Sequence, residues 1–425
     1  MPLRILHLSD IHFHASHWNA DGDVHDELIP DVARMVAEEG AMDAILVGGD
    51  IAFSGKPHEF EMAAAWLAAV RSAAGGLDES RVWTVPGNHD VDWTTVEESP
   101  IALQFRADIG AMEPRQVDSA LDRWVQDPCS DGLIRPLDAY NDFARPFSCA
   151  VHLKNPHWND RSLSVDGIAV QLSGLNSVLT SSERDARGQL VVGSFQSQLS
   201  RTPPAIRIAM IHHPPAWIKD WGVIQPFVRR AHVIFFGHEH AFNPTQSVDG
   251  GSVEISAGAV TPEREADGQV DPWLPSYNVV TLTFDDKLHV EVHPRRWDTP
   301  RSRFSLHPDG RREFDVDPDP AVDDLLVVGV AAADPIDASP LVAERTGTGA
   351  NETDAKRASS LRLLAVQFMN LATTDKVLIA RELGVFSDAD EQRPLDEVFP
   401  EILERIRDQY LIDELREQVA ALGNT

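Results

Sequence analysis

One pattern recurs through the first 240 residues and limits the fold more than any other feature. A short apolar run typical of a buried β-strand ends directly in Asp, Asn or His side chains. The pattern occurs five times, at Asp10-Ile11-His12, Gly49-Asp50, Gly87-Asn88-His89-Asp90, His212-His213 and Gly237-His238-Glu239-His240. Ligands of open α/β sheets bind at the carboxyl ends of strands, so these side chains are expected to meet there.

Segments with helical spacing separate the first strands. Residues 26–39 and 58–74 carry apolar side chains three and four positions apart, between apolar runs at 3–8, 44–47 and 82–85. This alternation predicts βαβ units and at least a partly parallel sheet. Further strands are expected at 168–175, 206–211, 233–236, 253–256, 279–284 and 288–292.

The pattern divides the chain into three parts. We expect a first domain over residues 1–306, with an insertion at about 96–160 that folds over the carboxyl edge of the sheet. Residues 307–360 are expected to hold one extra strand and a flexible linker, because they are rich in Gly, Thr, Ala and Asp. Residues 361–425 show only helical spacing and predict a small all-α bundle.

Charge and cysteine content narrow the function classes. The formal net charge of -30 repels bulk nucleic acid and anionic membrane, so nucleic acid is expected only as a substrate. No apolar run approaches the ~18 residues of a membrane span. The two cysteines, Cys129 and Cys149, lack metal-site spacing and predict reduced thiols in a cytoplasmic protein.

The polar residues at the strand ends are the donor types of a metal centre. Zn, Mn and Fe accept mixed shells of imidazole and carboxylate, and we expect two divalent ions. Asp50 follows the middle strand and is best placed to bridge them. The candidate ligands are Asp10, His12, Asp50, Asn88, His212, His238 and His240.

Such a centre predicts hydrolysis of a phosphate ester. Two ions lower the pKa of a bound water, and the resulting hydroxide attacks phosphorus in line with the leaving group. An imidazolium helps because charge develops on the leaving oxygen, and this role is assigned to His89, with Asp90 orienting it. His213 and Trp217 are candidate substrate-binding residues, although the sequence favours a packing role for Trp217.

These five motifs, in this order, resemble the signature blocks of the calcineurin-like metallophosphoesterases over about residues 3–295. The resemblance implies a four-layer α/β/β/α sandwich of two mixed sheets. It implies that Asp10, His12 and His240 hold one metal, while Asn88, His212 and His238 hold the other. The stretch GDIAFSGKPHEF is similar to the branch that includes cyclic-nucleotide phosphodiesterases and favours a phosphodiester substrate.

The sequence allows more than one function for the chain, and residues 361–425 add a separate prediction. Residues 361–425 resemble the helical, death-like adaptor domains of bacterial effector enzymes, which implies a protein partner. The favoured function is a dinuclear phosphodiesterase acting on a nucleotide-like or nucleic-acid diester. A phosphomonoesterase or nucleotidase with the same metals, and a non-catalytic metal-bound scaffold, are the alternatives.

Overall fold

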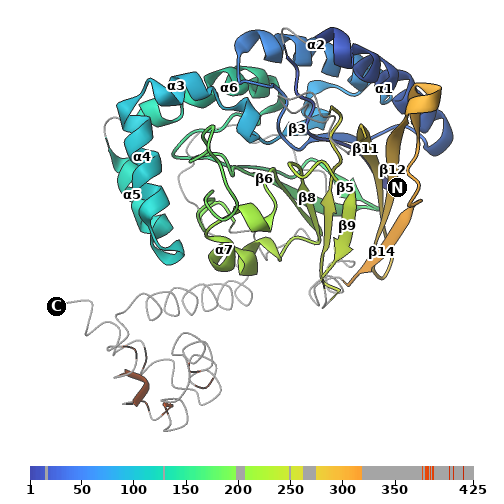
Figure 1. The fold of residues 1–425 in the computed structure, drawn as a ribbon. Helices are drawn as coiled ribbons and strands as arrows, with labels where there is room; N and C mark the ends of the chain where they lie inside the picture. The colour runs from blue at the N-terminus through green and yellow to red at the C-terminus, as the bar shows by residue number, and fades with distance from the viewer. Residues whose placement is uncertain are drawn as a thin grey trace, which may run out of the picture. The chain divides into compact units, whose positions relative to one another are not determined.

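A computed structural model describes residues 1–14, 18–127, 130–197, 206–247, 250–261 and 274–317, together with isolated positions between 376 and 415. The contacts within the chain divide it into two units, Met1–Val330 and Ala331–Thr425. The first unit is a mixed α/β fold with two sheets, as the sequence predicts (Figure 1).

The first sheet has seven strands, and the first strand of the chain lies at its centre. β1 pairs in parallel with β2, β2 pairs in parallel with β3, and β1 pairs antiparallel with β11. The strands are β1 (Leu3–Leu8), β2 (Ala44–Val47), β3 (Val82–Thr84), β11 (Ser276–Phe284), β12 (Leu288–Asp298), β13 (Arg303–Leu306) and β14 (Arg312–Val316).

The second sheet also has seven strands and is parallel at its centre. β6, β7, β8 and β10 run in parallel, whereas the edge strands β4, β5 and β9 pair antiparallel. The strands are β4 (Trp158–Asp160), β5 (Ser164–Val165), β6 (Ile168–Leu175), β7 (Ile206–Ile211), β8 (Val233–Phe236), β9 (Asn243–Gln246) and β10 (Val253–Ser256).

The two sheets share one apolar core, and helices cover their outer faces (Figure 1). Successive residues of β8 point to opposite faces: Val233 and Phe235 join the core between the sheets, whereas Ile234 and Phe236 join a second cluster with α7. The helices are α1 (Trp18–Glu39), α2 (Pro57–Ala73), α3 (Trp93–Glu97), α4 (Pro100–Ala111), α5 (Val117–Gln126), α6 (Asp138–Ala144) and α7 (Trp221–Val228).

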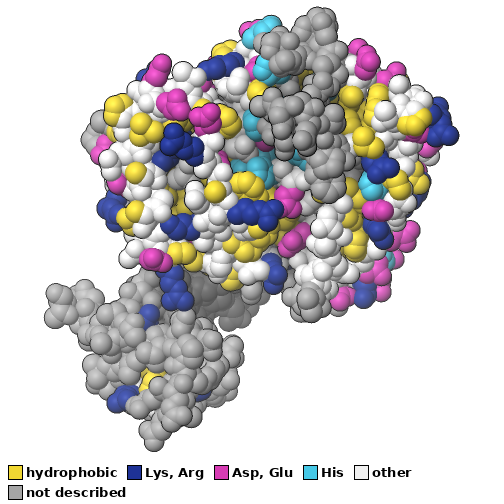
Figure 2. Space-filling view, in the orientation of Figure 1, with side chains coloured by type: hydrophobic (Ala, Val, Ile, Leu, Met, Phe, Trp, Pro, Cys, Tyr) yellow, Lys and Arg dark blue, Asp and Glu magenta, His cyan; other side chains and the backbone are white. Residues whose placement is uncertain are grey.

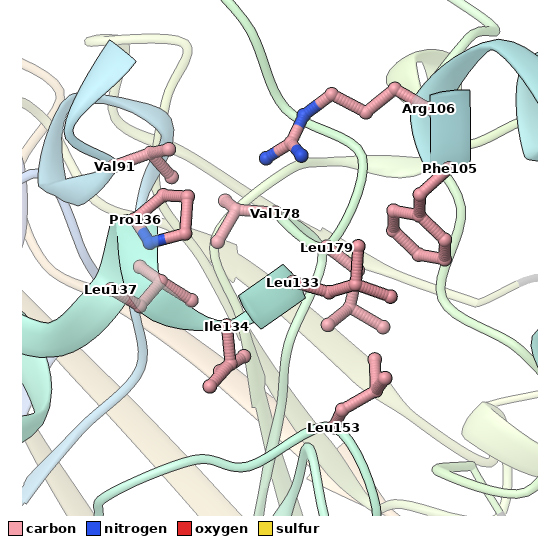
Figure 3. Close-up of a pocket in the computed structure, with 10 residues that line it drawn as sticks. All are labelled: Val91, Phe105, Arg106, Leu133, Ile134, Pro136, Leu137, Leu153, Val178 and Leu179. Carbon is pink, nitrogen blue, oxygen red and sulfur yellow. The ribbon is translucent and has the colours of Figure 1, made fainter. Parts of the chain in front are cut away.

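The segment at about 96–160 splits between two environments. Its last helix, α6, belongs to the main core, where Phe143 packs on Phe60 of α2 at 5.5 Å between ring centroids. Helices α4 and α5 instead form a separate apolar cluster with the loop after β6. This cluster contains Phe105 of α4 and Leu179 of the loop. Figure 3 shows where this cluster meets the main domain, around a cavity of only about 10 Å³. The expected insertion is therefore partly built into the core.

The first sheet continues past residue 306, where the sequence placed the end of the domain. β14 pairs with β12 at the edge of the sheet, and its exposed positions are charged, as an edge strand requires. Charge at alternate positions hid this strand from a search for apolar runs. The single extra strand suggested at 325–330 lies outside the described residues.

The second unit is described only at isolated positions. Leu383 donates its backbone N–H to the Ile379 carbonyl, and the Ile379, Ile402 and Leu415 side chains are buried. The predicted helical bundle and adaptor domain otherwise fall outside the described residues. Among the described residues of the chain, no helix is long and apolar enough to cross a bilayer.

Candidate metal centre

The loops that follow the strands hold the candidate ligands in an unusual backbone conformation. Positive φ angles occur at Asp10 (54°), His12 (51°), Asp50 (51°), His238 (69°) and His240 (52°). Side chains other than glycine rarely adopt this left-handed region, and such strain concentrates at functional sites. Most of the described non-glycine residues with positive φ are thus candidate ligands.

Backbone hydrogen bonds tie these loops together. The loop after β1 joins the loop after β2 because the Ile11 N–H donates to the Asp50 carbonyl at 2.8 Å. It also joins the loop after β10, where the Thr261 N–H donates to the Asp10 carbonyl at 3.0 Å. The ends of strands from both sheets are thereby fixed at one place, beside which histidines reach the surface (Figure 2).

Asp50 lies at the centre of the cluster. Its Oδ2 atom is 3.1 Å from Nε2 of His212 and 3.6 Å from Nε2 of His12. Its Oδ1 atom accepts a hydrogen bond from the His89 backbone N–H at 2.8 Å. Gly87 packs so closely that any side chain there would clash with the Asp50 carboxylate, which explains glycine before Asn88.

The ligand atoms converge, and several have no hydrogen-bond partner. Four overlapping groups each have their ligand atoms within 4.8 Å of one another: Asp10, His12 and His240; Asp10, Asp50 and His212; His12, Asp50 and His89; and His212, His213 and His238. Among the described residues, Oδ1 of Asp10 and Nε2 of His12 and of His212 are buried without a well-formed hydrogen bond, although each lies near a charged group of the cluster itself. Orphaned polar atoms are costly unless an ion satisfies them.

Two candidate histidine ligands are held by backbone carbonyls. Nδ1 of His12 lies 2.9 Å from the Thr261 carbonyl, and Nδ1 of His212 lies 2.7 Å from the Gly48 carbonyl. A carbonyl only accepts, so Nδ1 carries the proton on each ring and Nε2 is left as the donor atom toward a metal. Neither carbonyl is visible in sequence patterns, because any residue type supplies one.

The charged groups of the cluster shift one another's pKa values. Burial alone would lower the pKa of His212, but the Asp50 and Asp10 carboxylates outweigh it and raise that pKa to about 9. Burial and the neighbouring His212 lower the pKa of His238 to about 4. Burial disfavours ionised Asp50, yet the His212 and His89 imidazoles hold its pKa well below the usual range. The ionised Asp10 and Asp50 carboxylates thus bring negative charge together at one buried place, which favours binding of a cation.

Asp90 does not orient His89, so that part of the sequence prediction is wrong. Its carboxylate accepts hydrogen bonds from the backbone N–H groups of Ile51, Ala52 and Gly87 at 2.8–2.9 Å. Nδ1 of His89 instead lies 2.8 Å from the Phe53 carbonyl. Burial and the Asp50 charge raise the pKa of Asp90 to about 7. Asp90 therefore fixes the loops after β2 and β3.

His213 lies next to two candidate ligands, His212 and Asn88. The side chain is fully buried, with Nε2 3.0 Å from Oδ1 of Asn88 and Nδ1 2.9 Å from Oγ of Ser177. Both ring nitrogens are therefore engaged inside the protein, and the contact of His213 with substrate stays a prediction. Ser177 was missed, although Asn176 and Ser177 follow β6 in the same strand-then-polar pattern.

Trp217 and His238 lie side by side. Their ring centroids are 4.2 Å apart and nearly perpendicular, at 84°. Trp217 is half-buried, so its indole supports a candidate ligand on one side. Its contact with substrate stays a prediction.

Comparison with known proteins agrees with the geometry. A family model described as calcineurin-like phosphoesterase matches residues 3–242. An "uncharacterized metallophosphoesterase-like protein YydB" of Bacillus subtilis is 22% identical over 335 residues, which are 74% of this chain and 63% of the relative. The chain thus spans less than two thirds of that relative's length.

Solved structures are similar at low identity. A purple acid phosphatase from yellow lupin seeds is 12% identical with a TM-score of 0.41, covering 80% of this chain and 57% of its own. A phosphatase from Mycoplasma pneumoniae is 10% identical with a TM-score of 0.33, covering 76% of this chain and 97% of its own.

Proposed function

This chain belongs to the calcineurin-like phosphoesterase family, and from that premise we propose that it is a dinuclear, metal-dependent phosphodiesterase. The single observation that carries the proposal is the convergence of Asp10, His12, Asp50, His212 and His240, with buried donor atoms left without hydrogen bonds. A purely structural cluster would satisfy these atoms internally.

The donor set fits two divalent ions of the Mn, Fe or Zn type. Asp10, His12 and His240 would hold one, Asn88, His212 and His238 the other, and Asp50 would bridge. When bound, the two ions would supply a nucleophile at neutral pH and neutralise the charge of the phosphate. The strained loops of both sheets keep the side chains in place before any ion arrives.

His89 would donate a proton to the leaving oxygen. Because the Phe53 carbonyl accepts from Nδ1, the mobile proton of the imidazolium sits on Nε2. The His89 ring lies against the His12 ring, with centroids 4.9 Å apart, so this proton is next to the metal ligands. The preference for a diester rests on a resemblance of the stretch that contains Phe53, and substrate comparison decides it.

The experiment compares bis-p-nitrophenyl phosphate with p-nitrophenyl phosphate. Full-length protein is stripped of metal and reloaded with Mn, Zn or Fe, and kcat/KM is measured for both esters. The proposal predicts metal-dependent turnover with the diester preferred. Preference for the monoester would instead support a phosphomonoesterase or nucleotidase.

We also infer that residues 361–425 recruit a protein partner. The support is the amphipathic helical spacing of the sequence and the division of the chain into two units. Deleting residues 361–425 is expected to leave hydrolysis of bis-p-nitrophenyl phosphate intact. Loss of turnover in this variant would show that the tail serves the catalytic unit instead.

A further inference from the structure

A cavity of about 300 Å³ is lined by Trp93, whose ring neighbours that of His89. Its size is at the lower end of the range for small-molecule sites. Helices α3 and α4 and the loop after β6 form its walls. The lining side chains that matter below are Trp93, Val96, Glu97, Leu103, Glu183 and Arg184.

Trp93 connects this cavity to the candidate metal centre. Its ring centroid is 5.3 Å from that of His89, and the His89 ring in turn lies against His12. A group bound against Trp93 in the cavity is therefore one aromatic side chain away from His89.

The walls are fixed by hydrogen bonds. Arg106 of α4 donates from Nε to the Ser181 carbonyl at 2.8 Å, and Asp185 accepts from the Ser182 N–H at 2.8 Å. The opposite wall begins at Asp92, whose carboxylate caps α3 and accepts from Lys56 at 2.5 Å. A cavity held open in this way binds ligand at a lower ordering cost.

The lining combines a flat aromatic face with charged groups. Trp93 offers an indole face, and Leu103 is apolar although 46% exposed. Glu97 and Glu183 accept hydrogen bonds, whereas Arg184 donates them. A ligand that matches both properties is a flat heteroaromatic ring with donors and acceptors along its edge.

We propose that this cavity binds the base of a nucleotide substrate whose phosphate lies at the metal centre. The proposal rests on the phosphoesterase function above and adds the class of organic group that is recognised. An aliphatic or sugar-only ester would leave the Trp93 face uncovered and would gain little from the cavity.

The test is calorimetric binding of AMP and of ribose 5-phosphate to the metal-loaded full chain. These probes share the phosphate and the sugar and differ in the base. We expect AMP to bind at least about fivefold more tightly, as base stacking on an aromatic side chain provides. Trp93→Ala should remove that difference and Trp93→Phe should keep most of it. Arg145→Ala, at an exposed residue that is not part of the cavity lining, is the matched control.

Equal affinity of the wild-type chain for both probes would overturn the proposal. So would an AMP preference that survives both Trp93→Ala and Leu103→Glu, which places a charge at the exposed rim and serves if Trp93→Ala does not fold. Calorimetry measures the affinity for each probe and does not depend on turnover. Failure of the phosphoesterase function would appear separately, as absence of metal-dependent hydrolysis of bis-p-nitrophenyl phosphate.

Discussion

Nε2 of His213 lies 3.0 Å from Oδ1 of Asn88, and both side chains are buried. Since Oδ1 only accepts, Nε2 of His213 carries the proton, and Nδ1 accepts from the Ser177 hydroxyl. This chain of hydrogen bonds sets the direction of the Asn88 amide, whose oxygen keeps a second lone pair for a metal. His213 is thus a positioning residue for a candidate ligand.

Replacing His213 should weaken metal binding. We expect His213→Ala to lower metal affinity by about 10–100-fold, as loss of a partner behind a metal ligand does. His213→Gln keeps an N–H donor and should restore part of the affinity. Titration of metal-stripped protein with Mn or Zn measures both. Wild-type affinity in His213→Ala would show that Asn88 needs no support.

His89 is expected to act on the leaving group. His89→Ala should retain its metal while kcat falls by about 10²–10⁴-fold, the usual contribution of a general acid. The loss should be greater for an alkyl leaving group than for p-nitrophenol, which leaves without protonation. Metal content and kcat for both kinds of ester are measured side by side. An equal loss of kcat for both esters would show that His89 does not donate a proton to the leaving group.

The sequence predicted the strand ends well because two simple rules apply there. Apolar runs in a parallel sheet are buried on both faces, and polar residues after them meet at one edge. Thus Asp10, Asp50 and His212, from three strands, were brought together as expected.

Other features depend on contacts that spacing cannot reveal. His12 is oriented by the carbonyl of Thr261, 249 residues further along the chain, and Asp90 binds backbone N–H groups instead of its neighbour His89. Edge strands such as β14 have too few apolar residues to show the strand pattern. No sequence pattern indicates Trp93, because its role depends on how α3 and α4 pack.

A buried ion pair joins α1 to the first sheet. Asp31 is fully buried and accepts hydrogen bonds from Arg295 at 2.8 and 2.9 Å and from the Tyr277 hydroxyl at 2.6 Å. Asp31→Ala would leave the buried Tyr277 hydroxyl without its acceptor and the largely buried Arg295 guanidinium without its carboxylate, and should lower the free energy of unfolding by roughly 3–5 kcal/mol.

The matched control is Arg34, which bonds the same carboxylate but is 44% exposed. Arg34→Ala should cost no more than about 1 kcal/mol, because exposed pairs contribute little. Urea unfolding followed by tryptophan fluorescence compares the two variants. Similar losses of unfolding free energy in the two variants would show that the contacts of Asp31 with Arg295 and Tyr277 add little to stability.

Asp50 offers the most direct test of the two-metal account, because its carboxylate faces both His12 and His212. The measurement is metal content and bis-p-nitrophenyl phosphate turnover of wild type and Asp50→Asn after identical reloading with Mn, Zn or Fe. The account predicts about two ions per wild-type chain, as a two-metal site requires, with loss of metal and of turnover in the variant. Undiminished turnover in Asp50→Asn, or no turnover by wild-type protein that holds its ions, would contradict it.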